Sequence, residues 1–209
     1  MQRRLVVPVI VAAAWASATG CASVKPLDQT ALAPVIAAQP EGTPAPAYEP
    51  VWTAVLRWYR SHPEPTAGDV ACNFLTAMHR GSPCRAPTAL VLRKGPTPVP
   101  FSREWLASLS SEGLLEGLCA TDPHDCGAHN MATYIQLGDP SIDSLHAQLT
   151  VAEMGFNAAM CRPGLANVYG VIGAITFHLR TQDGAWRVER TEGGRLPVNV
   201  RCGHGAGTA

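Results

Sequence analysis

The chain has 209 residues, with 16 basic and 16 acidic side chains and a formal net charge of zero. Nucleic-acid binding is not expected, because neutralising phosphates requires clustered Lys and Arg and the sequence holds no basic stripe. No second long apolar segment follows residue 21, so we expect no transmembrane helix.

The first twenty residues have the pattern of an export signal. Arg3 and Arg4 form a positive start, and residues 5–18 then carry no charge. That uncharged stretch is 14 residues long, whereas a membrane-spanning helix needs roughly 20. Small residues follow, in the run Ser17-Ala18-Thr19-Gly20-Cys21. We therefore predict a signal peptide over residues 1–20.

A cysteine preceded by small residues at the end of such a segment resembles the lipobox of bacterial lipoproteins. Most members of that family have Leu where this chain has Ala18. The resemblance implies cleavage before Cys21, a diacylglycerol on its sulfur, and a further acyl chain (palmitate or similar) on the new N-terminus. It implies a cell-envelope protein whose partner is the membrane. The next residue, Ala22, implies the outer membrane facing the periplasm if the host is Gram-negative.

Two other interpretations of this segment stay open. Ala16-Ser17-Ala18 fits ordinary signal cleavage, which would release a soluble protein. Arg3-Arg4 could belong to a twin-arginine signal, although the flanking residues match that pattern poorly. All of these readings remove the segment from the folded domain.

The cysteine count suits an exported protein. The chain has seven cysteines, and setting Cys21 aside as the lipid site leaves an even number for disulfides. The candidates are Cys72, Cys84, Cys119, Cys126, Cys161 and Cys202. Sequential pairing is the simplest of 15 possible connectivities, and each bond would stabilise the domain by roughly 2.5 to 4 kcal/mol.

Composition divides the mature chain into three parts. Residues 21–47 begin with the lipidated cysteine and are rich in Pro and Ala, which predicts a flexible tether. Residues 48–202 have a natural size for one domain, and residues 203–209 form a flexible tail.

Helical patterns dominate the first half of the domain. Glu49-Pro50 opens a segment with apolar residues on one face, from which Trp58 falls away and so is expected to be partly exposed. Asp69 is the expected N-cap of a second helix, and Ser102 that of a third. A strand is expected over residues 89–92 between the last two helices.

Strand patterns dominate the second half. Strands are expected over residues 132–137, 145–156 and 167–180, followed by an Asp183-Gly184 turn and a return strand with Trp186 and Val188. Gly193-Gly194 is expected to lie in a terminal loop.

These patterns predict an α+β domain. We expect N-terminal helices packed on one face of a curved antiparallel sheet, stapled by disulfides. The final hairpin, Ile175–Arg180 through Asp183-Gly184 to Trp186–Val188, resembles the last two strands of nuclear-transport-factor-2-like domains. That resemblance implies a cone-shaped domain of a kind that hosts both enzymes and binding proteins, so it implies no activity.

Candidate chemical sites are few. The densest polar cluster contains Asp122, His124, Asp125 and His129, which are ligand types for zinc or copper but match no established metal motif. A surface loop closed by Cys119–Cys126 explains the same residues. We therefore assign no metal, no cofactor and no catalytic residue.

Two histidines in the expected strands are further candidate site residues. His146 and His178 lie in expected strands, and Glu153 could pair with either. The alternation places His178 opposite Phe177 and Leu179, and therefore toward solvent.

The sequence thus favours a membrane-anchored envelope lipoprotein whose domain binds an envelope protein or a small ligand without catalysis. The alternative is an extracytoplasmic hydrolase that uses a sheet cavity or a metal at His124 and His129.

Overall fold

The computed structural model of the chain describes residues 47–62, 65–78, 90–93, 101–119, 132–156 and 167–201. Its helices are α2 (Glu49–Ser61), α3 (Ala67–Met78) and α4 (Arg103–Ser111). Its strands are β1 (Leu90–Arg93), β2 (Gly117–Cys119), β3 (Ala132–Leu137), β4 (Ser141–Ile142), β5 (His146–Phe156), β6 (Asn167–Gln182) and β7 (Ala185–Arg201). They form one open sheet in the order β2-β1-β3-β5-β6-β7, with β4 paired to β5. The predicted α+β class is confirmed.

The sheet is mixed, which corrects the expected antiparallel sheet. β1 runs parallel to both β2 and β3, whereas the pairs from β3 through β5 and β6 to β7 are antiparallel. α4 lies between β1 and β2 in the chain, and parallel neighbours require a crossover of this kind. The sequence pattern missed β2 and β4, which have three and two residues.

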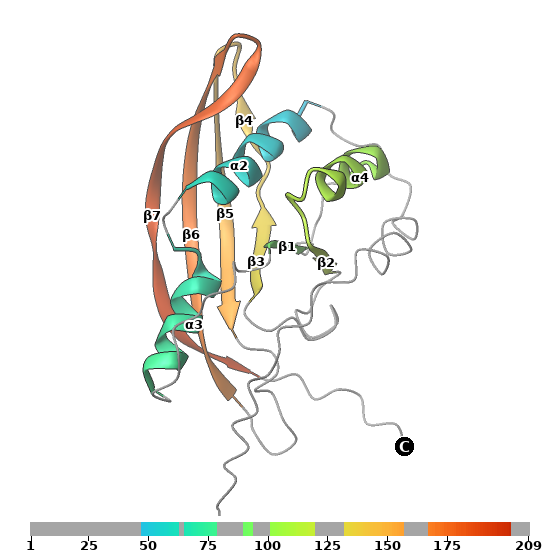
Figure 1. Cartoon of the computed structure of the whole chain (residues 1–209). Coiled ribbons are helices and arrows are strands. Elements are labelled where there is room, and N and C mark those ends of the chain that lie inside the picture. The colour runs from blue at the N-terminus through green and yellow to red at the C-terminus, as the bar shows by residue number, and fades with distance from the viewer. Residues whose placement is uncertain are drawn as a thin grey trace, which may run out of the picture.

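The helices cover one face of the sheet (Figure 1). Ile175, Phe177 and Leu179 of β6 pack in one buried cluster with residues of α2 and α4. Val171, on the same face of β6, packs with Ala67 and Ala71 of α3. The expected packing of helices on a single face is therefore confirmed.

Helix α2 packs an apolar side onto this face. Pro50 stands in its first turn, where its missing N–H costs nothing. Val51, Trp52 and Val55 are fully buried. Trp58 is also buried, so the expectation of partial exposure was wrong. It lies edge-on to Phe177 with ring centroids 5.2 Å apart.

Helix α4 is joined to α2 by hydrogen bonds at its first turn. The Ser102 hydroxyl accepts a hydrogen bond from the Trp105 N–H at 3.1 Å, which confirms the predicted N-cap. The Trp105 indole N–H donates to the Thr53 hydroxyl at 2.8 Å, and the Ser102 N–H donates to the Glu49 carboxylate at 3.2 Å. These bonds fix the angle between the two helices.

Helix α3 begins earlier than its expected N-cap. The Thr66 N–H donates to Asp69 Oδ2 at 2.9 Å, and the Asp69 N–H donates back to Thr66 Oγ1 at 3.3 Å. Asp69 therefore lies inside the first turn and completes a capping box, so its expected N-cap role was wrong. The Thr133 hydroxyl of β3 donates to Thr66 Oγ1 and accepts from the Gly68 N–H, at 2.6 and 3.0 Å.

This first turn of α3 lies against a strand position without a side chain. A Cβ placed on Gly155 of β5 would overlap the backbone of Ala67 and Gly68. The close approach of helix and sheet therefore depends on glycine at this position.

The last two strands form the predicted hairpin, but β7 is longer than expected. Asp183 and Gly184 have φ of 52° and 76°, as a two-residue turn of this type requires. β7 continues through Gly193-Gly194, which were expected to lie in a loop, and through Pro197. β7 is the last strand in the sheet order, and an edge strand tolerates a proline that a central strand would not.

Of the six cysteines expected to form disulfides, only Cys72 has a described side chain. Cys72 is buried in α3 and disulfide-bonded, and its partner is not among the described side chains. Cys119 ends β2, but its side chain is not described. The other candidates, Cys84, Cys126, Cys161 and Cys202, lie outside the described residues, as does Cys21. Stapling by three disulfides is therefore unsupported and stays a prediction.

No helix in the described ranges is both long and apolar enough to cross a membrane.

The contact between α3 and β5 predicts a strong difference between two glycine substitutions. Gly155→Ala should destabilise the fold by about 3 kcal/mol or more, because the new methyl group overlaps backbone that cannot turn away. Gly194→Ala should change stability by less than about 1 kcal/mol, because a Cβ there meets no atom within 4 Å. Urea unfolding of the two variants measures both values, and equal midpoints would contradict the contact.

Candidate functional site

The one buried acidic side chain of the described residues lies in the core of β5. The odd-numbered residues of β5 from Ala147 to Gly155 point toward the helices and are buried. Glu153 shares this parity, and its side chain has 0% of its surface exposed. A carboxylate held away from water in this way needs partners that replace its hydration.

Arg195 of β7 supplies the opposite charge. Its Nε donates to Glu153 Oε2 at 2.7 Å and its Nη2 donates to Glu153 Oε1 at 2.9 Å. The pair therefore has two parallel charge-assisted hydrogen bonds, the strongest geometry for these two groups. The Arg195 side chain remains 18% exposed, so the pair lies at the border of the core.

Glu153 and Arg195 lie on strands either side of β6. Glu153 of β5 lies opposite Gly173 of β6, and Gly173 lies opposite Arg195 of β7. A Cβ at Gly173 would come within 3.0 Å of Arg195 Cγ and 3.4 Å of Glu153 Oε2. The missing side chain on the middle strand therefore gives the two charged groups the space in which they meet.

Tyr59 of α2 completes the cluster from the helix side. Its hydroxyl donates to Glu153 Oε1. Burial first, and then the charge of Glu153 and the hydrogen bond to it, raise the pKa of the Tyr59 phenol well above its ordinary value of 10.0, while Arg195 lowers it. At neutral pH the phenol is thus an uncharged hydrogen-bond donor.

The Tyr59–Glu153–Arg195 cluster is a buried ion pair whose carboxylate makes its hydrogen bonds within the cluster. Both oxygens of Glu153 accept hydrogen bonds from within the cluster, and Tyr59 cannot serve as a base while its proton is held so firmly. Such a network fixes the position of α2 on the sheet and orders the edge strand.

The structure separates residues that the sequence analysis had grouped. Even-numbered residues of β5 and β6 point away from the helices, and His146 and His178 are among them. Neither histidine pairs with Glu153, so that expectation was wrong. His178 lies opposite Phe177 and Leu179 as expected, but its side chain is 20% exposed rather than fully turned to solvent. Its ring nitrogens lie 3.4 Å from Arg190 and 3.5 Å from Glu192.

The expected metal candidates cannot be placed. Asp122, His124, Asp125 and His129 all lie outside the described residues. Within the described ranges, no group of three or more His, Cys, Asp or Glu side chains is arranged to hold a metal ion.

Sequence reasoning missed the Tyr59–Glu153–Arg195 cluster, although one signal for it is present. Ala147, Leu149 and Val151 alternate with polar residues along β5, and Glu153 continues the apolar parity. A charged residue at an inward position demands a partner, and that demand could have been recognised. Its partner on β7 could not, because the expected strand ended before Arg195.

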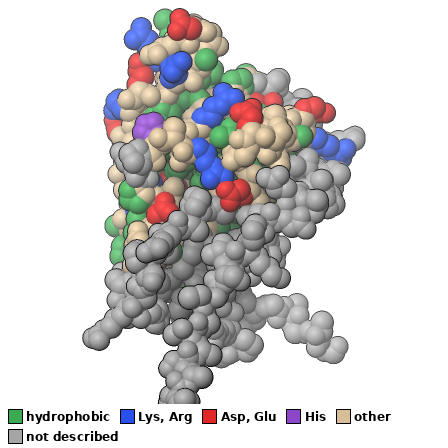
Figure 2. Space-filling view, in the orientation of Figure 1, with side chains coloured by type: hydrophobic (Ala, Val, Ile, Leu, Met, Phe, Trp, Pro, Cys, Tyr) green, Lys and Arg blue, Asp and Glu red, His purple; other side chains and the backbone are tan. Residues whose placement is uncertain are grey.

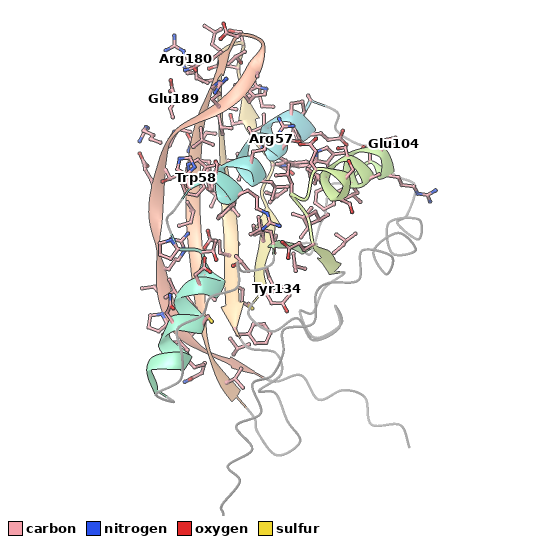
Figure 3. All side chains as sticks on the ribbon, viewed as in Figure 1. Arg57, Trp58, Glu104, Tyr134, Arg180 and Glu189 are labelled. Carbon is pink, nitrogen blue, oxygen red and sulfur yellow. The ribbon has the colours of Figure 1, made fainter. Side chains whose placement is uncertain are left out.

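Charges on the remaining surface are mixed. On the face shown in Figure 2, basic and acidic side chains alternate over α2 and α4. Arg57 pairs with Glu112 at 2.7 Å, and Arg180 approaches Glu189 at 3.9 Å near the hairpin turn (Figure 3). Exposed pairs of this kind contribute little to stability.

Comparisons of the chain with protein-family models, with curated proteins and with solved structures find no match.

The buried pair predicts a non-additive response to substitution. Arg195→Met should destabilise the domain by about 3–5 kcal/mol, because it leaves the Glu153 charge buried with a single donor. The double variant Glu153→Gln with Arg195→Met should be more stable than Arg195→Met alone, because the unpaired charge is gone. Denaturant unfolding of the four proteins in the cycle measures this, and purely additive losses would rule out a coupled pair.

The raised pKa of Tyr59 predicts a specific loss of stability in alkali. Because the folded-state pKa lies above the unfolded value of 10.0, its contribution is fully present below pH 10 and is lost as the pH rises beyond it. Between pH 10 and 11 the wild type should lose up to about 1.4 kcal/mol more than Tyr59→Phe, which has no phenol to titrate. Unfolding free energies at pH 8, 10 and 11 test this, and parallel curves for the two proteins would refute it.

Proposed function

We propose that this chain is a membrane-anchored envelope lipoprotein whose folded domain binds a partner and has no catalytic role. The anchor is proposed from Cys21 and the signal before it, and the domain from the geometry of the described residues.

The closed state of the Tyr59–Glu153–Arg195 cluster is the observation that carries the non-catalytic part. A general acid or base needs a proton that it can exchange with a substrate in its reach. Among the described residues, the one fully buried carboxylate is Glu153, and both its oxygens accept hydrogen bonds from Arg195 and Tyr59. Its arrangement supports a role in holding α2 and β7 to the sheet.

The proposed anchor adds a physical reason for a binding role. The Pro- and Ala-rich residues 22–47 follow Cys21 and are proposed to act as a tether, since a flexible chain of that length would span roughly 30 Å. Two or more acyl chains would hold such a domain at the membrane on a cellular timescale, because each buried methylene contributes about 0.8 kcal/mol. Disulfides among the six remaining cysteines are part of the same proposal.

The anchor predicts that Cys21→Ser moves the protein out of the membrane fraction. The wild type should partition with membranes and incorporate labelled palmitate, whereas the variant should lose the lipid mass. Ala22→Ser, one residue away, is the matched control and should keep both properties. Intact-mass measurement of the native protein reports the outcome directly. A wild-type N-terminus at Thr19 without lipid would overturn the anchor in favour of a soluble secreted protein.

The hydrolase alternative keeps its own test, because it depends on residues outside the described ranges. Turnover of ester, amide or phosphoester substrates that is lost in His124→Ala and His129→Ala would contradict the non-catalytic part of the proposal, whatever the anchor result.

A further inference from the structure

The sheet ends at a long strand that is paired on one side. β7 has 17 residues and stands last in the strand order, so within the sheet it pairs only with β6. Near the hairpin turn, its open side has no described element beside it (Figure 1). An open edge presents a row of backbone N–H and C=O groups that can pair with another strand. The residues along β7 therefore determine which strand fits there.

The direction of the backbone groups along β7 follows from its pairing with β6. The Thr181 N–H donates to the Leu145 carbonyl at 2.9 Å, so the odd-numbered residues of β6 direct their backbone groups to β5. The residues of β7 that lie opposite them direct theirs to the open edge. Near the hairpin these residues are Trp186, Val188, Thr191 and Gly193.

A β-bulge lies in the middle of this segment. Val188 and Arg190 pair with successive residues of β6, so Glu189 is the extra residue. Thr191 is three positions after Val188, yet both direct their backbone groups to the edge and both lie opposite residues that face the helices. The bulge therefore changes the parity of β7 at this point.

The charges around the bulge are self-complementary in the antiparallel direction. The run is Arg187-Val188-Glu189-Arg190-Thr191-Glu192. Read backwards, it has a charge of opposite sign at every charged position and a neutral residue at every neutral position. An antiparallel strand with the same sequence therefore places an opposite charge beside each charged residue, which stabilises a strand pair.

We propose that β7 pairs edge to edge with β7 of a second copy of this chain, antiparallel, about a two-fold axis perpendicular to the sheet. Arg187 then lies opposite Glu192 of the second copy, and Glu189 lies opposite its Arg190, each twice by symmetry. Val188 lies opposite Thr191 of the second copy, and these are residues whose backbone groups face the edge. The two sheets become one, with the helices of both copies on the same side.

The hydrogen bonds and the charges favour the same register. When the bulges of the two copies face each other, the extra residue of one strand is matched by that of the other, and the alternation of side chains is kept. Moving the second strand by two residues brings Arg187 opposite Arg190 in one direction and Glu189 opposite Glu192 in the other. Like charges directly opposite each other destabilise a strand pair.

The contacts of these side chains within one copy leave them available. All four charged residues of the run are exposed. Arg190 pairs with Glu192, and Glu189 lies 3.9 Å from Arg180, whereas Arg187 makes no ion pair in the described part of the chain. Exposed pairs of this kind contribute little, so they are readily exchanged for pairs across the edge.

The size of the contact sets its strength. The self-complementary run has six residues, whereas a stable interface takes roughly 20–30 residues from each partner. In strand pairing of this kind, backbone hydrogen bonds supply the affinity and the side chains supply the specificity. We therefore expect a weak, reversible association that weakens further as salt screens the exposed charges.

Charge reversal tests the pairing in sedimentation equilibrium of the purified full chain. Arg187→Glu and Glu192→Arg should each weaken self-association at least about tenfold, because each places like charges opposite each other. An equimolar mixture of the two variants should recover the association, because every like-charged pair becomes an opposite pair between the two chains. Arg57→Glu is the matched control, since Arg57 is exposed on α2 and pairs with Glu112, and it should leave the association unchanged.

The mixture is the decisive measurement. Damage that a substitution does to its own chain is not repaired by mixing, and unfolding midpoints near the wild-type value show that both variants fold. Unchanged association of the two single variants, or no recovery in the mixture, would overturn the proposal. A wild-type chain that stays monomeric throughout the concentration series would also overturn it.

A proline substitution tests the backbone hydrogen bonds separately. Thr191→Pro removes an N–H that is directed to the edge and none that pairs with β6, so the fold should persist while the association is lost. Pro197 already stands opposite an odd-numbered residue of β6, Val171, and so at a position of the same kind. A Thr191→Pro variant that associates as tightly as the wild type would exclude pairing through the backbone.

Discussion

The buried carboxylate of Glu153 is the constraint on which the arrangement of the domain depends. A buried charge is tolerated only where other groups replace its water, and here those groups come from two other elements. Arg195 reaches it from the edge strand, and Tyr59 reaches it from the helix above. Gly173 leaves the space in which they meet. One buried side chain thus links α2 and β7 to the central strand β5.

The two faces of the sheet differ in what covers them. On the helix face, apolar residues of β5 and β6 pack under α2 and α4 (Figure 1), and the ion pair lies at the border of that core. Away from the helices, the sheet changes from apolar to charged along its length. Beyond α2 the β6–β7 hairpin end projects past the helices (Figure 1).

Local patterns in the sequence predicted the local structure well. Ser102 at a helix start, Asp183-Gly184 between alternating runs and the period of two in β6 each depend on neighbouring residues alone, and the structure confirms them. One failure is local, because the N-cap of α3 is Thr66 and not Asp69, but most involve partners distant in sequence. Trp58 is buried because β6 brings Phe177 to it, and the short β2 exists only because β1 lies beside it. The Tyr59–Glu153–Arg195 cluster joins residues that no window of the sequence contains together.

The ion pair across β6 also couples three positions that lie far apart in the sequence: Glu153, Gly173 and Arg195. Gly173 gives Glu153 and Arg195 the space in which they meet, and the buried charge of Glu153 depends on Arg195 beside it. A lineage that replaced the pair with apolar residues would free position 173 to gain a side chain at the same time. Across natural variants of this chain, the three positions should therefore be kept together or lost together, while the exposed rows on the other side of the same strands drift independently of them.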